Sequence, residues 1–245
     1  SKPNAWPDRL PVMAGVISKT NPDIIGTQEG KFYQLKELNK EIPNYTWFGT
    51  GRDGDSRGEF MAIFYKPNRF EILEYDHFWL SDTPNVIGST TWGHSNRRMV
   101  TWIRFLDKKT KREFYFWNTH FDHRVQPARE KAASLVNEKV AELKTELPII
   151  LVGDFNASAK MNKTYDILVG DGGFEDTIVT AKESINADWN TINGFRETRK
   201  GSRRIDWVLS KGGVKTLEAE IVLFDNRKQY PSDHQPVSAT IVLEK

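Results

Sequence analysis

The 245-residue sequence contains no cysteine, which excludes a disulfide framework and a thiolate metal site. It also lacks an apolar run long enough to span a membrane, so no membrane span is expected. Neither sign of charge is in excess, because 35 basic residues stand against 33 acidic ones and the net charge is +2. This balance permits binding to nucleic acid without indicating it. The compartment is left open between the cytoplasm and export after removal of an N-terminal segment.

Internal repeats, low-complexity tracts and linkers are absent as well, so a single mixed α/β domain over residues 1–245 is expected. Residues 157–202 are rich in glycine and are expected to be mostly loop with one short helix. Helical spacing of apolar residues predicts helices at 9–20, at 31–40 and from 127 onward. Apolar or alternating runs predict strands at 23–29, 99–106, 113–120, 148–152, 205–210, 214–223 and 237–243, with several more inside 45–80.

Polar residues mark the ends of these strands. Taken singly, each has an ordinary explanation as a helix cap, a turn residue or a structural histidine. Asp206 is harder to explain in this way, because a carboxylate between Ile205 and Trp207 must be paired or solvated. Side chains at strand ends often meet at one site, and the set as a whole predicts one. The segments are "IIGTQEG" with Glu29, "FYFWNTHFDHR" with His120, "IILVGDFNAS" with Asp154 and Asn156, "RIDWVL" with Asp206, and "PSDHQPV" with Asp233 and His234.

The residue types of this set indicate a chemistry. Carboxylates without cysteine, and with only five histidines in the chain, favour a hard cation such as Mg²⁺, Mn²⁺ or Ca²⁺ over zinc. Hydrolysis of a phosphate ester needs a metal to offset charge, a base for water, and donors for the transition state. Carboxylates such as Glu29 suit the first task, Asp154 or a histidine the second, and Asn156 with a histidine the third. The set is chemically complete for phosphoester hydrolysis.

Six ordered motifs carry a family resemblance. They are "IIGTQE", "GEFMAIFYKPNRF", "FWNTHFDHR", "GDFNAS", "RIDWVL" and "YPSDHQPV". In this order they resemble the endonuclease/exonuclease/phosphatase superfamily, the pancreatic deoxyribonuclease-like metal-dependent phosphoesterases, and most of all its short uncharacterised bacterial members. The resemblance covers nearly the whole chain. It implies an α/β fold, a four-layer α/β/β/α sandwich of two mixed, mainly antiparallel sheets flanked by helices, with the active site at one end of the sheets.

The resemblance also implies residue roles at the metal and the attacking water. Glu29 would bind the metal, which is expected to be Mg²⁺, or Mn²⁺ or Ca²⁺. Asp233 would face the same metal. Asp154 would orient or deprotonate the water, and Asn156 would hold a phosphoryl oxygen.

Two histidines are expected to contact the scissile phosphate. Neighbouring side chains of an extended strand point to opposite faces, so Asp233 and His234 do not readily pair with each other. The resemblance implies instead that Asp206 orients His234 and that Glu59 orients His120. A carboxylate on one ring nitrogen fixes the tautomer and leaves the other nitrogen for phosphate.

The sequence departs from the family pattern at its start. Family members begin with a strand whose asparagine helps to form the metal site, and here the sequence starts just before the stretch that follows that strand, Asn4–Arg9. We expect the strand to precede this sequence, because loss of a central strand would expose an edge and weaken a buried sheet.

Candidate substrate contacts are less specific. Arg98 is a candidate phosphate ligand, with a surface salt bridge as the alternative. Trp189 is a candidate for stacking on a base or sugar, with packing beneath a loop as the alternative. The basic stretch "GFRETRKGSRR" is either a landing loop for a phosphate-rich substrate or a solvated hairpin, with Arg196, Arg199, Lys200, Arg203 and Arg204 as its cations.

Three functions remain open. The leading one is a divalent-metal-dependent phosphoesterase, with a small phosphorylated molecule slightly favoured as substrate. The second is a Mg²⁺-dependent nuclease acting on DNA or RNA, and the third is a catalytically silent binding module. The set of acids and histidines disfavours the third, and a monomer is expected.

Overall fold

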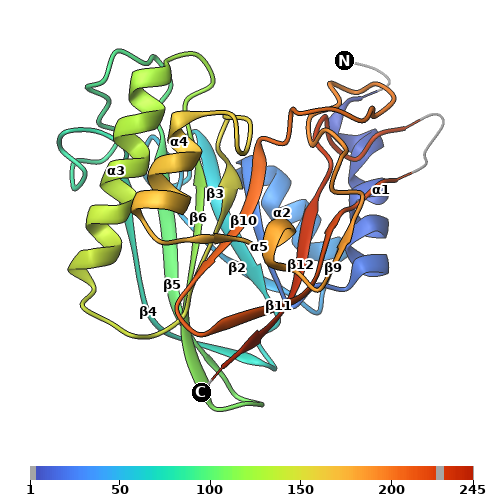
Figure 1. The fold of residues 1–245 in the computed structure, drawn as a ribbon. Helices are drawn as coiled ribbons and strands as arrows, with labels where there is room; N and C mark the ends of the chain where they lie inside the picture. The colour runs from blue at the N-terminus through green and yellow to red at the C-terminus, as the bar shows by residue number, and fades with distance from the viewer. Residues whose placement is uncertain (1–3, 225–228, 245) are drawn as a thin grey trace.

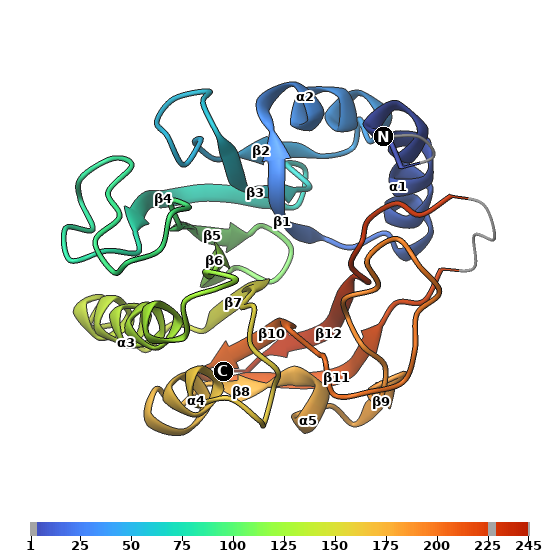
Figure 2. The same cartoon turned by 90° about the horizontal axis from the view of Figure 1, so that it is seen from above.

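The computed structural model describes residues 4–224 and 229–244. Two helices, α1 (Trp6–Thr20) and α2 (Phe32–Glu41), cover one side of the molecule, and α3 (Gln126–Glu142) covers the other, with the strands between them (Figures 1 and 2). The strands are β1 (Ile24–Lys31), β2 (Thr46–Phe48), β3 (Glu59–Tyr65), β4 (Phe70–Trp79), β5 (Met99–Asp107), β6 (Arg112–His120), β7 (Ile149–Asp154), β8 (Glu175–Asp176), β9 (Glu183–Ile185), β10 (Asp206–Lys211), β11 (Val214–Ile221) and β12 (Val237–Leu243).

Hydrogen bonding divides the strands into three sheets. A six-stranded sheet has the order β4-β5-β6-β7-β10-β8, and two three-stranded sheets have the orders β1-β3-β2 and β12-β11-β9. Both three-stranded sheets pack on the same face of the six-stranded sheet, since Ile63 of β3 and Ile241 of β12 share a cluster with Phe105 and Ile150. The architecture is therefore the expected α/β/β/α sandwich, except that its second β layer is split. Within the described residues β1 and β12 each end a sheet, and a strand preceding the sequence stays a prediction.

Strand β3 shows why these residues form a central layer. Its sequence EFMAIFY is almost wholly apolar, and all five inner residues are buried. Phe60, Ala62 and Phe64 pack with α1 and α2, whereas Ile63, on the opposite face, packs against the six-stranded sheet. A strand that is buried on both faces needs such a continuous apolar run, because alternation would place polar groups in one of the two interfaces.

Most expected elements are present, with small differences at their ends. The first helix begins at Trp6, three residues before the expected Arg9, because Pro7 suits the first helical turn. The region 157–202 holds more structure than expected. Two short helices, α4 (Lys163–Asp166) and α5 (Thr177–Thr180), begin where the side chains of Asn162 and Asp176 accept hydrogen bonds from the backbone, and a π-helical turn, Ile167–Asp171, follows α4.

The register of the six-stranded sheet gathers polar residues at one end. His120 of β6 lies opposite Asp154 of β7, and Asp154 lies opposite Asp206 of β10. Residues directly opposite each other point to the same face of a sheet. Val152, two residues before Asp154 in β7, and Val208, two residues after Asp206 in β10, belong to the cluster between the sheets. The polar row therefore faces the end of the space between the two β layers.

Candidate active site

Glu29 reaches this end of the molecule through an irregularity in β1. The pairing of β1 with β3 shifts register between Thr27 and Gly30, and Glu29 has a φ of 62°. A bulge of this kind turns a side chain away from the regular alternation, and strained non-glycine backbone gathers at functional sites. Burial raises the pKa of Glu29, and the nearby charges of Glu59 and Asp233 raise it further. Glu59 and Asp233 thus each lie within electrostatic reach of Glu29.

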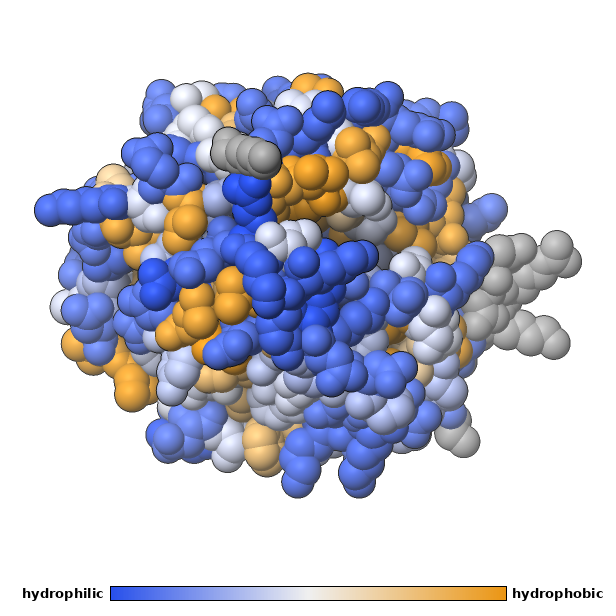
Figure 3. Space-filling view, turned by 90° about the horizontal axis from the view of Figure 1, so that it is seen from below, coloured by the Kyte–Doolittle hydropathy of each residue, from blue (hydrophilic) through white to orange (hydrophobic). Residues whose placement is uncertain are grey.

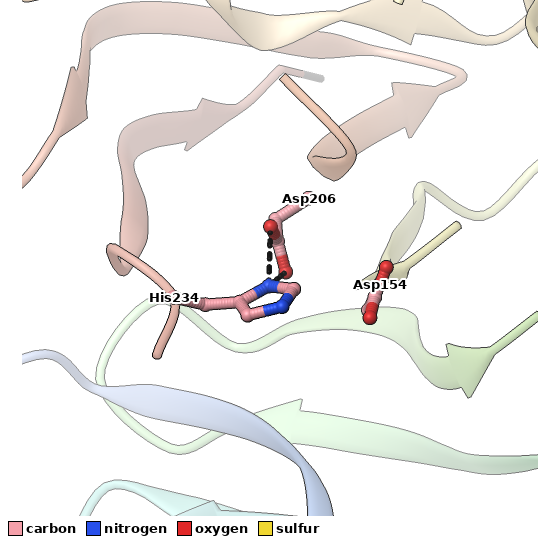
Figure 4. A group of neighbouring side chains, drawn as sticks. All are labelled: Asp154, Asp206 and His234. Atoms are coloured by element: carbon pink, nitrogen blue, oxygen red, sulfur yellow. Dashed lines mark hydrogen bonds and ion pairs between the residues drawn. The ribbon is translucent and has the colours of Figure 1, made fainter. Parts of the chain in front are cut away.

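His234 is held by Asp206. Its Nδ1 lies 3.0 and 2.9 Å from the two carboxylate oxygens of Asp206, as Figure 4 shows. Burial acts to lower the pKa of His234, but the charge and hydrogen bond of Asp206, together with Asp154 and Asp233, raise it to about 10. The imidazole is therefore a cation at neutral pH. The expected pairing is present, although β12 begins only at Val237, so His234 precedes the strand.

Asp154 and Asn156 form a compact turn after β7. The backbone N–H of Asn156, whose φ is 50°, donates to Asp154 Oδ1 at 2.8 Å. Gly153 is required before this turn, because a Cβ there would lie 2.3 Å from the carbonyl oxygen of Thr119. Burial, and then the charge of Asp206, raise the pKa of Asp154 to about 7, while His234 acts in the opposite direction. The Asp154 carboxyl thus titrates near neutral pH.

The prediction that Glu59 orients His120 is wrong. His120 Nε2 lies 3.1 Å from Asn156 Nδ2 and 3.4 Å from Asp154 Oδ2, and its buried Nδ1 has no partner among the described residues. Glu59 is instead paired with Arg52 at 2.6 Å, because the backbone of Arg52 also bonds to Glu59 and brings the two side chains together. Burial, and then the charge of Arg98, lower the pKa of His120 well below its usual value.

Arg98 lies at the end of the polar row and is not a surface residue. Only 3% of it is exposed, and its Nε and Nη1 have no hydrogen-bond partner in the described part of the chain. Its Nη2 lies 3.3 Å from His123 Nδ1, and its Nε is 4.0 Å from Asp122 Oδ2. Burial and the neighbouring charge of Arg52 lower its pKa. A buried guanidinium with unused donors is suited to an anion.

Sequence reasoning overlooked three polar neighbours of Arg98, namely His94, Asp122 and His123. Asp122 is 4% exposed, and His94 is buried with both ring nitrogens unpartnered among the described residues. Asp122 and His123 follow directly after the end of β6, just as Asn156 follows the end of β7. The strand-end argument that selected Asn156 therefore could have selected these two, whereas no comparable signal marks His94.

The structure separates the candidate substrate residues from one another. Trp189 packs against the cluster of Ile178 and Ala219, which is the alternative foreseen for a loop tryptophan. The prediction that Arg204 contributes to a landing loop is wrong, because this residue is buried in an ion pair with Asp176. Its partner is 28 residues away in sequence, and the pairing offsets the cost of burying either charge alone.

Two sets of residues are suited to a metal ion. Among the residues the structure describes, the ligand atoms of Asp154, Asp206 and His234 all lie within 4.8 Å of one another. Both oxygens of Asp206, however, are bonded to His234. Glu29 and Asp233, the metal ligands that the resemblance implies, lie outside this group, and repulsion from the charges of Glu59 and Asp233 raises the pKa of Glu29, while the Glu59 carboxylate is paired with Arg52. A divalent cation bound by carboxylate oxygens would relieve this repulsion, so the donor set fits a hard metal such as Mg²⁺.

Two cavities lie at different distances from the polar row. A cavity of about 540 Å³ is lined by Lys66, Arg69, Lys108 and other residues of the turns at the far ends of β3 and β5. These turns belong to the opposite end of the sheets, on the mostly hydrophilic face in Figure 3, and Arg69 is occupied by Asp23 and Asp107. A cavity of about 360 Å³ adjoins Asn156 and His123. The smaller cavity is therefore the one next to the polar row.

Comparison with known proteins places this geometry in context. The model of the Endonuclease/Exonuclease/phosphatase family matches residues 1–234. A mannosyl-6-phosphatase of Bacteroides thetaiotaomicron, Bt3783, is 35% identical, with a TM-score of 0.90 over 97% of this chain and 92% of that chain. An uncharacterized protein of Acanthamoeba polyphaga mimivirus is 31% identical over 64% of this chain, and this chain spans 61% of its length. The structure of D. rerio TDP2 with a single-strand DNA product is 16% identical and has a TM-score of 0.73. The match spans 98% of this chain and 94% of that chain, so the two proteins share the fold. Among the described residues no helix is long and apolar enough to cross a membrane.

Proposed function

The chain belongs to the endonuclease/exonuclease/phosphatase family, and on that basis we propose that it is a divalent-metal-dependent phosphoesterase. One observation carries the proposal above all. The cationic His234, held by Asp206, lies beside the buried carboxyl of Asp154 at the end of the β layers (Figure 4). A fixed imidazolium next to a carboxyl that titrates near pH 7 pairs an acid with a base.

In the proposed reaction water attacks phosphorus and the ester oxygen leaves. Asp154 accepts the proton of the water, since a pKa of about 7 suits a base at neutral pH. Asp206 fixes one ring nitrogen of His234, and the other holds the negative charge that develops on the departing ester oxygen and gives it a proton, so that it leaves as an alcohol. Glu29 and Asp233 would hold the metal. When bound, that ion offsets the charge on the phosphoryl oxygens.

The remaining residues bind and orient the phosphate. The Nδ2 of Asn156 donates to the Phe121 carbonyl at 3.1 Å and lies 3.1 Å from His120 Nε2 and 3.4 Å from Asp154 Oδ2. In the proposal a phosphoryl oxygen beside the attacking water replaces the longest of these contacts, the one to Asp154. His120 is buried and neutral, and it acts as a hydrogen-bonding partner rather than as a charge. Arg98 offers two unused donors and a positive charge in the same row. We assign it to a non-bridging oxygen of the phosphate.

The proposed substrate is a small phosphorylated molecule, and a sugar phosphate is favoured. The similarity to a mannosyl-6-phosphatase supports this class. Burial of Arg204 also removes one cation from the basic stretch that a nucleic acid would use.

Phosphate release from a panel of phosphoesters tests the proposal. Sugar phosphates, plasmid DNA and abasic-site DNA are each incubated with Mg²⁺, Mn²⁺ or Ca²⁺ and with a chelator. We expect metal-dependent release from the sugar phosphates that the chelator abolishes. Nicking of DNA without activity on small esters would establish the nuclease instead. Absence of hydrolysis with every metal, together with no metal binding by calorimetry, would favour the binding module.

A further inference from the structure

The smaller cavity, of about 360 Å³, opens directly from the proposed reaction centre. It begins at Asn156 and His123, two residues that flank the phosphate position proposed above. One wall continues from the turn after β7, and the opposite wall belongs to the segment that leads into β10. The cavity is lined by His123, Asn156, Ala157, Ser158, Met161, Asn162, Ile192, Arg203 and Ile205.

Backbone hydrogen bonds tie both walls of this cavity to the catalytic residues. Ile192 forms an isolated β-bridge with His234. The hydroxyl of Thr191 accepts from the backbone N–H of Ile205 at 3.0 Å and from that of Asp206 at 3.2 Å. The two walls are joined to each other where the N–H of Ala159 donates to the carbonyl of Arg204 at 3.0 Å. The cavity is therefore held at a fixed position relative to Asp206 and His234.

The lining has a distinctive composition, because it contains no carboxylate. The lining is mainly polar, with Ser158 and Arg203 as donors, and Met161 and Ile192 supply its smaller apolar part. Neither donor side chain has a hydrogen-bond or salt-bridge partner among the described residues, and Arg203 is exposed. Such a mixture fits a ligand with both C–H faces and hydroxyl groups.

Asn162 plays a different part in the lining. Its Oδ1 accepts from the backbone N–H of Thr164 at 3.0 Å, and its Nδ2 donates to Gln126 at 3.0 Å. Its amide is therefore engaged in holding the wall, so recognition of a ligand falls to Arg203 and Ser158.

The cavity size limits the ligand. Pockets for small molecules have volumes of roughly 300–1,000 Å³, so this one is at the low end and suits a single ring with its substituents. A nucleic-acid duplex, whose major groove alone is about 12 Å wide, is far larger.

We propose that this cavity binds the alcohol part of the phosphoester, a polyhydroxylated ring of about one sugar unit, and that Arg203 is its specificity-determining residue. The guanidinium of Arg203 donates to neighbouring hydroxyls of the ring, and the apolar wall packs against the C–H face. This inference rests on the proposed function, because the cavity adjoins the phosphate position only if Asn156 and Arg98 hold the phosphate.

Turnover of two substrates by Arg203→Met tests the assignment. A hexose 6-phosphate has hydroxyls for Arg203, whereas p-nitrophenyl phosphate has none. Loss of hydrogen bonds from a charged donor should lower kcat/KM for the hexose 6-phosphate roughly ten- to a hundredfold. For p-nitrophenyl phosphate it should change by less than about threefold. The matched control is Arg112→Met, a partly exposed arginine at the start of β6, at the opposite end of the sheet from His120 and outside the cavity lining, which should alter neither substrate. Equal losses on both substrates, or none, would overturn the assignment.

A binding measurement keeps the test independent of catalysis. Calorimetry with metal-free protein compares a hexose 6-phosphate with inorganic phosphate. We expect the wild-type protein to bind the sugar phosphate more tightly than inorganic phosphate. The Arg203→Met variant should bind the two with equal affinity. If wild-type protein binds the two equally, the cavity does not hold the sugar and this inference fails, whatever the turnover. If the sugar phosphate binds more tightly but no ester is hydrolysed with any metal, the proposed function fails and the binding site stands.

Discussion

Asp206→Asn isolates the interaction that the site depends on most. The substitution keeps the shape of the side chain and removes the charge that faces His234 Nδ1 at 2.9 Å. Asp206 is the first of the groups that raise the pKa of His234 to about 10, against an ordinary value of 6.5. Asp154 and Asp233 contribute the rest. We therefore expect the substitution to lower the pKa of His234 strongly without returning it fully to its ordinary value.

The size of the effect follows from the geometry. A close opposite charge shifts a pKa by roughly 1–3, which corresponds to about 1.4–4 kcal/mol. Because the pKa of His234 is higher in the folded protein than in the unfolded chain, its contribution to stability is complete below about pH 6.5 and is lost as the pH rises through about 10. The substitution also removes the repulsion that raises the pKa of Asp154, which offsets part of the loss above pH 7. The difference in unfolding free energy between the variant and the wild type should thus shrink between pH 7 and pH values above 10.

The assay is an NMR titration of the His234 imidazole in metal-free protein, with denaturant unfolding at the two pH values. Asp188→Asn serves as the control, because Asp188 pairs with Lys200 at 2.7 Å but both side chains are largely exposed. Such a surface pair contributes about 0–1 kcal/mol, so this variant should leave His234 and the pH trend unchanged. An unaltered His234 pKa in Asp206→Asn would refute the reasoning.

Three further outcomes are expected. Arg98→Met removes a buried cation with unused donors and should therefore raise the inhibition constant of inorganic phosphate roughly tenfold or more. An unchanged constant would exclude Arg98 from the phosphate site. Glu29→Gln should weaken Mg²⁺ binding at least about tenfold by calorimetry, and equal affinity in both proteins would assign the metal elsewhere. Gly153→Ala places a Cβ 2.3 Å from the Thr119 carbonyl and should lower the free energy of unfolding by about 1–3 kcal/mol in a denaturant titration, whereas wild-type stability would contradict the close packing of β6 and β7.

Local patterns predicted most of the fold, because the strands here are strongly apolar and short. The short apolar run in "IILVGD" is typical of a buried strand, and the structure has β7 there, fully buried. Residues 157–202 hold two short helices, α4 and α5, where one was expected, since four-residue helices lack a hydrophobic period and depend on the capping side chains of Asn162 and Asp176. The division of the second β layer into two sheets depends on strand pairing, which periodicity does not report.

The candidate site was predicted in part. Placing Asp206 against His234 followed from the resemblance, and the register of β7 with β10 explains how Asp154 joins them. The pairing of Glu59 with His120 failed because a closer cation, Arg52, approaches Glu59 in the folded chain. Arg52 and Glu59 are close in sequence, yet the backbone hydrogen bond that brings them together depends on the turn between them, for which hydrophobic periodicity carries no signal.

The most direct test of the central claim is the rate of phosphate release by Asp154→Asn at saturating Mg²⁺ beside the wild type. The substitution keeps the hydrogen-bonding shape of the side chain and removes the proposed base, whose pKa is about 7. The account predicts a fall of roughly a hundred- to ten-thousandfold with an unchanged near-UV circular dichroism spectrum. A rate close to that of the wild type would contradict it.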